Sequence, residues 1–121
     1  MRNLPLLLLI FLTLFALPVK AQTAVAPLYP NAANASLAVT ATTGASTATA
    51  ISPAPQEMVT NTGSQTGFVA FGGSAVAATT TSIPIPAGAI EVFSLDPTMG
   101  YVSALTSTST TQLYFTGGRG N

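Results

Sequence analysis

The stretch that decides the fold is Ser82–Leu105, which reads SIPIPAGAIEVFSLDPTMGYVSAL. Within it, β-branched, aromatic and polar residues nearly alternate over Ala89–Leu95, and Tyr101–Leu105 resumes a strand-like pattern. The segment DPTMG at 96–100 has turn chemistry, because proline fixes φ and glycine accepts a positive φ. The pattern predicts one β-hairpin, made of two strands and this turn, within an all-β domain.

Further short strand patterns lie on both sides of this stretch. They occur at 36–42, 47–52, 56–60, 67–71, 76–82 and 112–116. Pro84 and Pro86 cannot donate ladder hydrogen bonds, so residues 83–86 are expected at an edge or a crossover. Turn signals recur about every 8–12 residues, and no helical apolar period follows the N-terminal leader. The chain is therefore expected to form an antiparallel β-sandwich, jelly-roll or Ig-like, or a small barrel.

The N-terminus has the pattern of a secretory leader. Arg2 precedes an almost continuous apolar run, Leu4–Leu17, and Val19 and Ala21 are small residues placed for cleavage before Gln22. We expect residues 1–21 to be a hydrophobic signal helix that directs export to the cell surface or beyond. The run is short for a membrane span, which needs about 20 residues, although an uncleaved anchor or a buried core segment remain alternatives.

The rest of the chain divides into three parts by composition. Residues 22–35 contain Pro27, Pro30 and two asparagines without a clear period, so they are expected to form an extended arm or linker. Residues 36–116 carry the strand patterns and form the expected β-sandwich domain. Residues 117–121, GGRGN, are expected to be a flexible glycine-rich tail.

Charge and composition exclude several kinds of function. The 121-residue chain has three basic residues, three acidic residues, and no Cys, His or Trp. Without the leader, Arg119 is the sole basic residue, so no basic patch could neutralise nucleic-acid phosphates. The absence of cysteine removes disulfides, thiolate chemistry and a lipidated cysteine.

The acids give little basis for catalysis or metal binding. Glu57, Glu91 and Asp96 are expected to be solvated surface charges, with Asp96 starting a turn. Glu91 and Asp96 are an odd number of positions apart, so a continuous strand would direct them to opposite faces. A carboxyl pair with Glu57, or weak calcium binding, stays open. We predict no catalytic, cofactor-binding or metal-ligating residue, no cofactor, and no enzymatic activity.

Three motifs resemble those of small β proteins encoded by tailed bacteriophages. They are an F-x-x-F-G strand at Phe68–Gly72, P-x-P-A-G-A-x-E-V-F at Pro84–Phe93, and a glycine-rich end after Y-F-T at Tyr114–Thr116. The resemblance spans roughly residues 36–120. It implies a virion component that decorates, or is accessory to, a head or tail, and it implies no catalytic residues. Members of that family usually lack a leader; a prophage-derived or phage-encoded exported protein would reconcile the two.

Three functions are therefore expected in order. The first is a non-catalytic structural or assembly module that docks on a larger protein lattice, in the virion if the resemblance holds. Its partners would be other protein chains, including copies of itself, because charge-poor strand edges invite pairing. The second is a secreted bacterial surface, matrix or adhesion module. The third is a secreted carbohydrate-binding or hydrolytic domain using Tyr29, Tyr101 or Tyr114. Membrane contact is expected only through an uncleaved leader.

Overall fold

The computed structural model describes residues 28–30, 36–44 and 46–120, and over these residues the chain is all-β with no helix. The strands are β1 Tyr29–Pro30, β2 Leu37–Thr42, β3 Thr49–Ala50, β4 Gln56–Asn61, β5 Gly67–Gly72, β6 Ile83–Ile85, β7 Ile90–Ser94, β8 Tyr101–Thr106 and β9 Thr110–Arg119. In this part of the chain, no helix is long and apolar enough to cross a membrane. The predicted signal helix, residues 1–21, lies outside the described residues.

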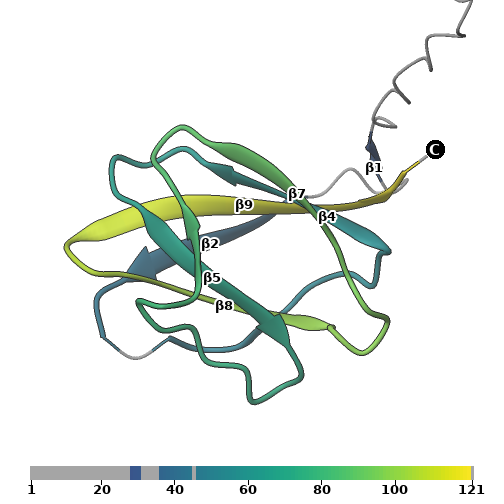
Figure 1. Ribbon diagram of the computed structural model, residues 1–121, viewed down its shortest axis with the longest axis horizontal. Helices are drawn as coiled ribbons and strands as arrows, with labels where there is room; N and C mark the ends of the chain where they lie inside the picture. Colours follow the sequence, from purple (N-terminus) through teal and green to yellow (C-terminus); the bar gives the residue numbers. More distant parts are fainter. Residues whose placement is uncertain (1–27, 31–35, 45, 121) are drawn as a thin grey trace, which may run out of the picture.

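The strands form two antiparallel sheets (Figure 1). Sheet A has the order β1-β9-β4-β7, and β2 also pairs with β9, beside the part of β9 that precedes the β1 contact. Sheet B has the order β3-β8-β5-β6. From β2 onward, successive strands change sheets at every step except β5 to β6. The prediction of an all-β fold with antiparallel strands is confirmed.

The predicted hairpin around residues 96–100 is wrong, because its two strands belong to different sheets. β7 pairs with β4 in sheet A, whereas β8 pairs with β3 and β5 in sheet B. The turn itself forms: the Met99 N–H donates to the Asp96 carbonyl at 2.9 Å. The Leu95 N–H donates to Pro55 O, next to β4, and Gly100 O accepts from Ile51 N–H, next to β3. These bonds fix the two ends of the turn to different sheets.

One hydrophobic core lies between the sheets. Val59 and Leu113 of sheet A and Val69, Ile85 and Val102 of sheet B are all completely buried. Each alternates with outward-facing neighbours, as the two-residue period of a strand requires.

Aromatic side chains extend this core. Phe115 is 1% exposed, and its ring lies 6.2 Å from that of Phe71 in a T-shaped arrangement. Phe93 of β7 packs on Phe71 at 5.4 Å. The three rings come from β9, β5 and β7, so they join the two sheets.

The expected glycine-rich tail is instead part of a strand. β9 continues through Gly117 and Gly118 to Arg119, where it pairs with both β1 and β4. Glycine at 118 is needed because a Cβ there would contact the Tyr29 carbonyl and the side chain of Leu28. In the expected arm, Tyr29–Pro30 forms β1, whereas residues 22–27 and 31–35 lie outside the described part.

The threonine-rich segment at 76–82 was expected to be a strand, but it is a loop that crosses the outer face of sheet B. The Ala78 N–H donates to Ser103 Oγ at 3.0 Å, and both residues are buried. Hydroxyl groups bond the backbone locally, for example Thr79 N–H to Ser82 Oγ at 2.9 Å. Such bonds compete with a strand ladder. The loop therefore covers Ser103 on the outside of sheet B.

Candidate functional site

The outer face of sheet A is the candidate site. On β4, Val59 points into the core, so the even-numbered residues point outward. The registers with β2, β7 and β9 extend this assignment across the sheet. The face consists of Ala38, Thr40, Thr42, Gln56, Met58, Thr60, Ile90, Val92, Ser94, Gln112, Tyr114 and Thr116. None of these residues is charged.

This face exposes large apolar side chains. Ile90 is 62% exposed, Val92 49% and Tyr114 37%. The register places Ile90, Thr60 and Tyr114 in one row across β7, β4 and β9, and it places Val92 beside Met58 in the next row. Grouped apolar exposure rimmed by polar residues marks interaction surfaces more often than scattered exposure does.

The edges of the two sheets differ in how open they are. In sheet B, β3 has two residues and β6 contains Pro84, features that protect an edge from pairing. In sheet A, β2 and β7 have six and five residues and contain no proline. Glu91 is the one charged residue in these two strands. Among the described strands, β2 and β7 are therefore the edges best able to accept another strand.

Glu57 is buried, which corrects the expectation of a solvated surface charge. It is 2% exposed on the inward side of β4, opposite Phe93 and Gly117. Its Oε2 atom has no hydrogen-bond partner among the described residues. Burial raises the pKa of Glu57 to about 7. The sequence could have predicted this burial, because Glu57 and Val59 are two positions apart on one strand and therefore share a face.

The other two acids lie elsewhere and do not form a metal centre with Glu57. Glu91 is exposed, and its register partner is Val59 rather than Glu57. Asp96 Oδ1 accepts hydrogen bonds from the Thr98 N–H at 2.9 Å and the Thr98 hydroxyl at 2.7 Å, which lower the pKa of Asp96. No group of three or more His, Cys, Asp or Glu side chains in the described ranges could hold a metal ion.

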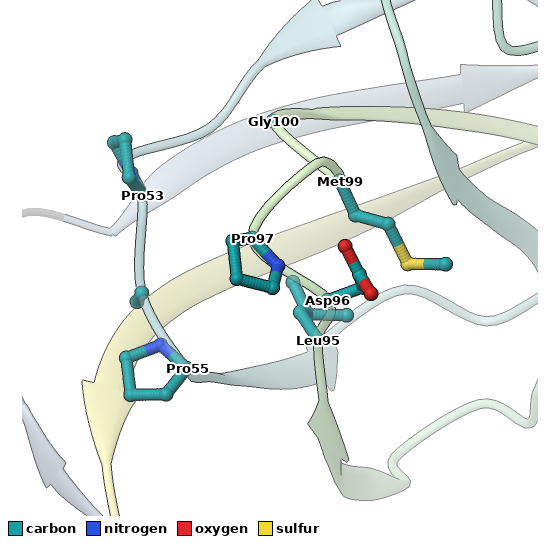
Figure 2. A pocket seen from close by; sticks show the side chains of 8 residues that line it. Pro53, Pro55, Leu95, Asp96, Pro97, Met99 and Gly100 are labelled. Atoms are coloured by element: carbon teal, nitrogen blue, oxygen red, sulfur yellow. The ribbon is translucent and has the colours of Figure 1, made fainter.

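A small apolar pocket lies beside the turn that joins the sheets (Figure 2). Its volume is about 340 Å³. Figure 2 shows Pro53 and Pro55 on one side and Pro97, Asp96 and Met99 on the other. Asp96 is the one charged residue in its lining, and no base or nucleophile pair faces it. The lining therefore combines one carboxylate with mainly apolar side chains.

The three tyrosines do not form one sugar-binding platform. Tyr114 points outward from sheet A, whereas Tyr101 lies on the outer side of sheet B, opposite Gly72. Tyr29 is 47% exposed in β1, at the far end of β9. Stacking on a sugar ring needs aromatic side chains on a common face. The arrangement therefore offers little to the carbohydrate hypothesis.

The described residues thus offer an open, uncharged sheet face and a small apolar pocket as candidate sites. The sheet face carries Ile90, the most exposed of the large hydrophobic side chains in the described ranges. Asp96 is the one carboxylate among the residues of these two features. No protein-family model, curated protein or solved structure matches the chain significantly.

Proposed function

We propose that this protein is a non-catalytic structural module that docks on a larger protein lattice through the outer face of sheet A, as a virion decoration or accessory protein does. The main observation in support is that this uncharged face exposes Ile90, Val92 and Tyr114. The loop at 73–82 covers Ser103 on the corresponding face of sheet B. The asymmetry favours one specific docking face.

The fold that we propose for the domain, a jelly roll, supports this function. Strand orders β2-β9-β4-β7 and β3-β8-β5-β6, with the chain crossing between sheets at nearly every step, are what eight strands wound as two Greek keys give. Jelly rolls recur in viral capsid and lectin domains. The fold is compatible with assembly, but docking is inferred from the exposed residues of the face and not from the fold.

Docking through this face has favourable energetics. Burying Ile90 and Val92 removes apolar area from water, and the absence of charge means that no ion must be desolvated without a partner. Tyr114, on the central strand β9, is the natural anchor, since tyrosine is enriched among the residues that dominate binding energy. We expect the association to depend little on salt, because screening acts on charges.

The test is to measure the copy number of the protein on purified particles from its source. Tyr114→Lys places a charge at the centre of the face and is expected to lower the copy number by about tenfold or more, the loss of an anchor residue. The matched control is Ser74→Lys, an exposed position in the loop over sheet B, which should leave the copy number unchanged. Quantitative mass spectrometry gives both values.

Two results would overturn this proposal. The first is the absence of the unmodified protein from every particle fraction. The second is an equal loss of copy number in Tyr114→Lys and Ser74→Lys, which would show that sheet A has no special role. The thermal midpoints of both variants identify any loss that is caused by unfolding.

The second candidate function is a secreted bacterial surface, matrix or adhesion module, and the predicted leader at residues 1–21 favours it. N-terminal sequencing of the native protein, combined with cell fractionation, separates the candidates. A chain that starts at Gln22 outside the cell supports the surface module. An intact Met1 inside particles supports the virion component.

A further inference from the structure

We propose that β7 pairs with β7 of a second copy, in an antiparallel two-fold dimer centred on Val92. The inference goes beyond the docking function and does not rest on it, because it follows from the free edge of sheet A. Such a dimer would join sheet A of one copy to sheet A of the other, as one continuous sheet. Its partner is a second copy of this chain.

The backbone of β7 presents alternate residues to the open edge. In an antiparallel ladder, a residue that bonds one neighbouring strand directs both its N–H and C=O there, and the next residue directs them away. Ala89 O accepts from Asn61 N–H at 3.0 Å, and Leu95 N–H donates to Pro55 O at 2.9 Å. The odd-numbered residues therefore face β4, and Ile90, Val92 and Ser94 direct their N–H and C=O groups outward.

A two-fold axis at Val92 satisfies all of these outward groups. Val92 then bonds Val92 of the second copy, and Ile90 exchanges bonds with Ser94 of the second copy. Glu91, the one charge of the strand, falls opposite Phe93 of the second copy. Centring the pair on Glu91 would instead oppose two like charges and leave Ser94 unpaired. The edge is self-complementary in one register.

The exposed side chains also favour β7 over the other edges. Pairing at Val92 brings its side chain, 49% exposed, against that of its copy on the outer face. Ile90, 62% exposed, lies next to this contact. The rival edge, β2, would bring together only Ala38, Thr40 and Thr42, which are small or polar. Pairing through β7 would therefore remove more apolar surface from water than pairing through β2.

The dimer is expected to be weak. Two five-residue strands bury less than the roughly 1,200 Å² at the low end of stable interfaces, so the dissociation constant should be micromolar or weaker. Docking on a lattice would raise the local concentration and promote pairing there. Sedimentation of the purified protein between about 1 and about 500 µM covers this range. A protein that remains monomeric throughout would overturn the proposal.

Single cysteines test the register, because the chain contains no cysteine of its own. Hydrogen-bonded antiparallel partners have Cα atoms about 5.5 Å apart, within the range of a disulfide. Under oxidation, Val92→Cys should form a cross-linked dimer. Ile90→Cys is the matched control: it lies opposite Ser94 of the second copy, too far from its own equivalent to cross-link. Cross-linking that is stronger at position 90 than at 92 would overturn the proposed register.

A pair of proline variants tests the edge. Val92→Pro removes an outward N–H without breaking a bond to β4, so the sheet can tolerate it but the dimer cannot. Thr40→Pro removes an outward N–H from β2 in the same way. Gln112 O accepts from Thr62 N–H, so the even residues of β9 bond toward β4 and its odd residues bond toward β2. The odd residues of β2 pair with these, which leaves the N–H of Thr40 directed outward. We expect Val92→Pro to be monomeric and Thr40→Pro to dimerise; the reverse result would place the interface at β2.

The unmodified protein keeps this inference distinct from the proposed docking function, because Val92 itself belongs to the proposed docking face. Its copy number on particles and its oligomeric state in solution are measured separately. Particle association with a monomeric protein in solution would overturn the dimer and leave the docking function intact. Dimers in solution without any particle association would do the opposite. Circular dichroism of each variant confirms that its strands are retained.

Discussion

Replacing Glu57 by glutamine is expected to raise the free energy of unfolding by up to about 3 kcal/mol at pH 8 and to change it little at pH 4. The reason is the position of the carboxyl group, which is 2% exposed and lies on the inward side of β4. Burial raises its pKa to about 7. Above that pH, the folded protein holds a charge in its interior, and glutamine removes the charge at nearly the same volume.

The direction of the pH dependence follows from proton binding. Between the ordinary pKa of about 4.5 and the folded pKa of about 7, the folded protein holds a proton on Glu57 that the unfolded chain releases. Stability is therefore highest below about pH 4.5, and is lost as the pH rises through 7. The loss amounts to about 1.4 kcal/mol per pH unit inside this window. Asp96, whose pKa is lowered, acts oppositely and only below its ordinary value of 3.8.

Urea unfolding between pH 4 and pH 8 measures this effect. The matched control is Glu91→Gln, which removes an exposed acid from the neighbouring strand and should stay within about 0.5 kcal/mol of the native protein at each pH. Glu57→Gln should flatten the decline between pH 4.5 and 7. If Glu57→Gln and the native protein decline in parallel, the carboxyl group is not the cause, and its burial has no thermodynamic consequence.

The strands could be predicted because their signal is local. Leu113 and Phe115 alternate with Gln112, Tyr114 and Thr116, and both point into the core as that period predicts. The break at Gly72–Gly73 also corresponds to the end of β5. Alternation indicates which side of a strand faces the core. It does not indicate which other strand lies beside that strand in the sheet.

The pairing could not be predicted because it depends on residues far along the chain. The turn at Asp96 forms as its residues indicate, yet the residues at its two ends, Leu95 and Gly100, bond Pro55 and Ile51, which lie 40 and 49 positions earlier. A local pattern of strand, turn and strand is the same for a hairpin and for a connection between two sheets. The long-range pairing decides between them: β7 lies beside β4 in sheet A, whereas β8 lies beside β3 and β5 in sheet B.

The candidate site divides in the same way. The shortage of charge predicted a surface suited to other chains, but the choice of sheet A depends on the loop that lies on Ser103 of sheet B. The burial of Glu57 could have been predicted, because Glu57 lies two positions before Val59 and therefore on the same face of the strand. The misassigned threonines at 76–82 show the limit of propensity: their β-branched shape suits a strand, while their hydroxyls bond the loop instead.

The second large effect is expected at Asn61, where alanine should lower the free energy of unfolding by about 4 kcal/mol. This residue is 1% exposed at the end of β4, and its amide group makes four hydrogen bonds. Nδ2 donates to the Gln65 and Ile85 carbonyls at 2.8 Å each. Oδ1 accepts from the Gly63 N–H at 3.0 Å and from the Thr111 hydroxyl at 2.7 Å. One side chain thus connects β4, β6, β9 and the turn between the sheets.

Alanine would leave two buried partners, Ile85 O and the Thr111 hydroxyl, and two partly buried ones without these hydrogen bonds, at about 1 kcal/mol for each group. The matched control is Thr111→Val, which removes one of the four bonds at similar volume and should cost about 1 kcal/mol. Because total stabilities are about 5–15 kcal/mol, Asn61→Ala should lower the thermal midpoint far more than Thr111→Val does.

Asn61→Asp separates lost bonding from lost packing, because it keeps the shape and the acceptor that Gly63 and Thr111 use. Its second oxygen would face the Gln65 and Ile85 carbonyls, so the ionised form should be as damaging as alanine. Protonation gives that oxygen one hydrogen to donate, so stability should partly recover as the pH falls. A cost that is equal for Asn61→Ala and Thr111→Val, or an Asp variant insensitive to pH, would show that Asn61 does not hold the two sheets together through its amide.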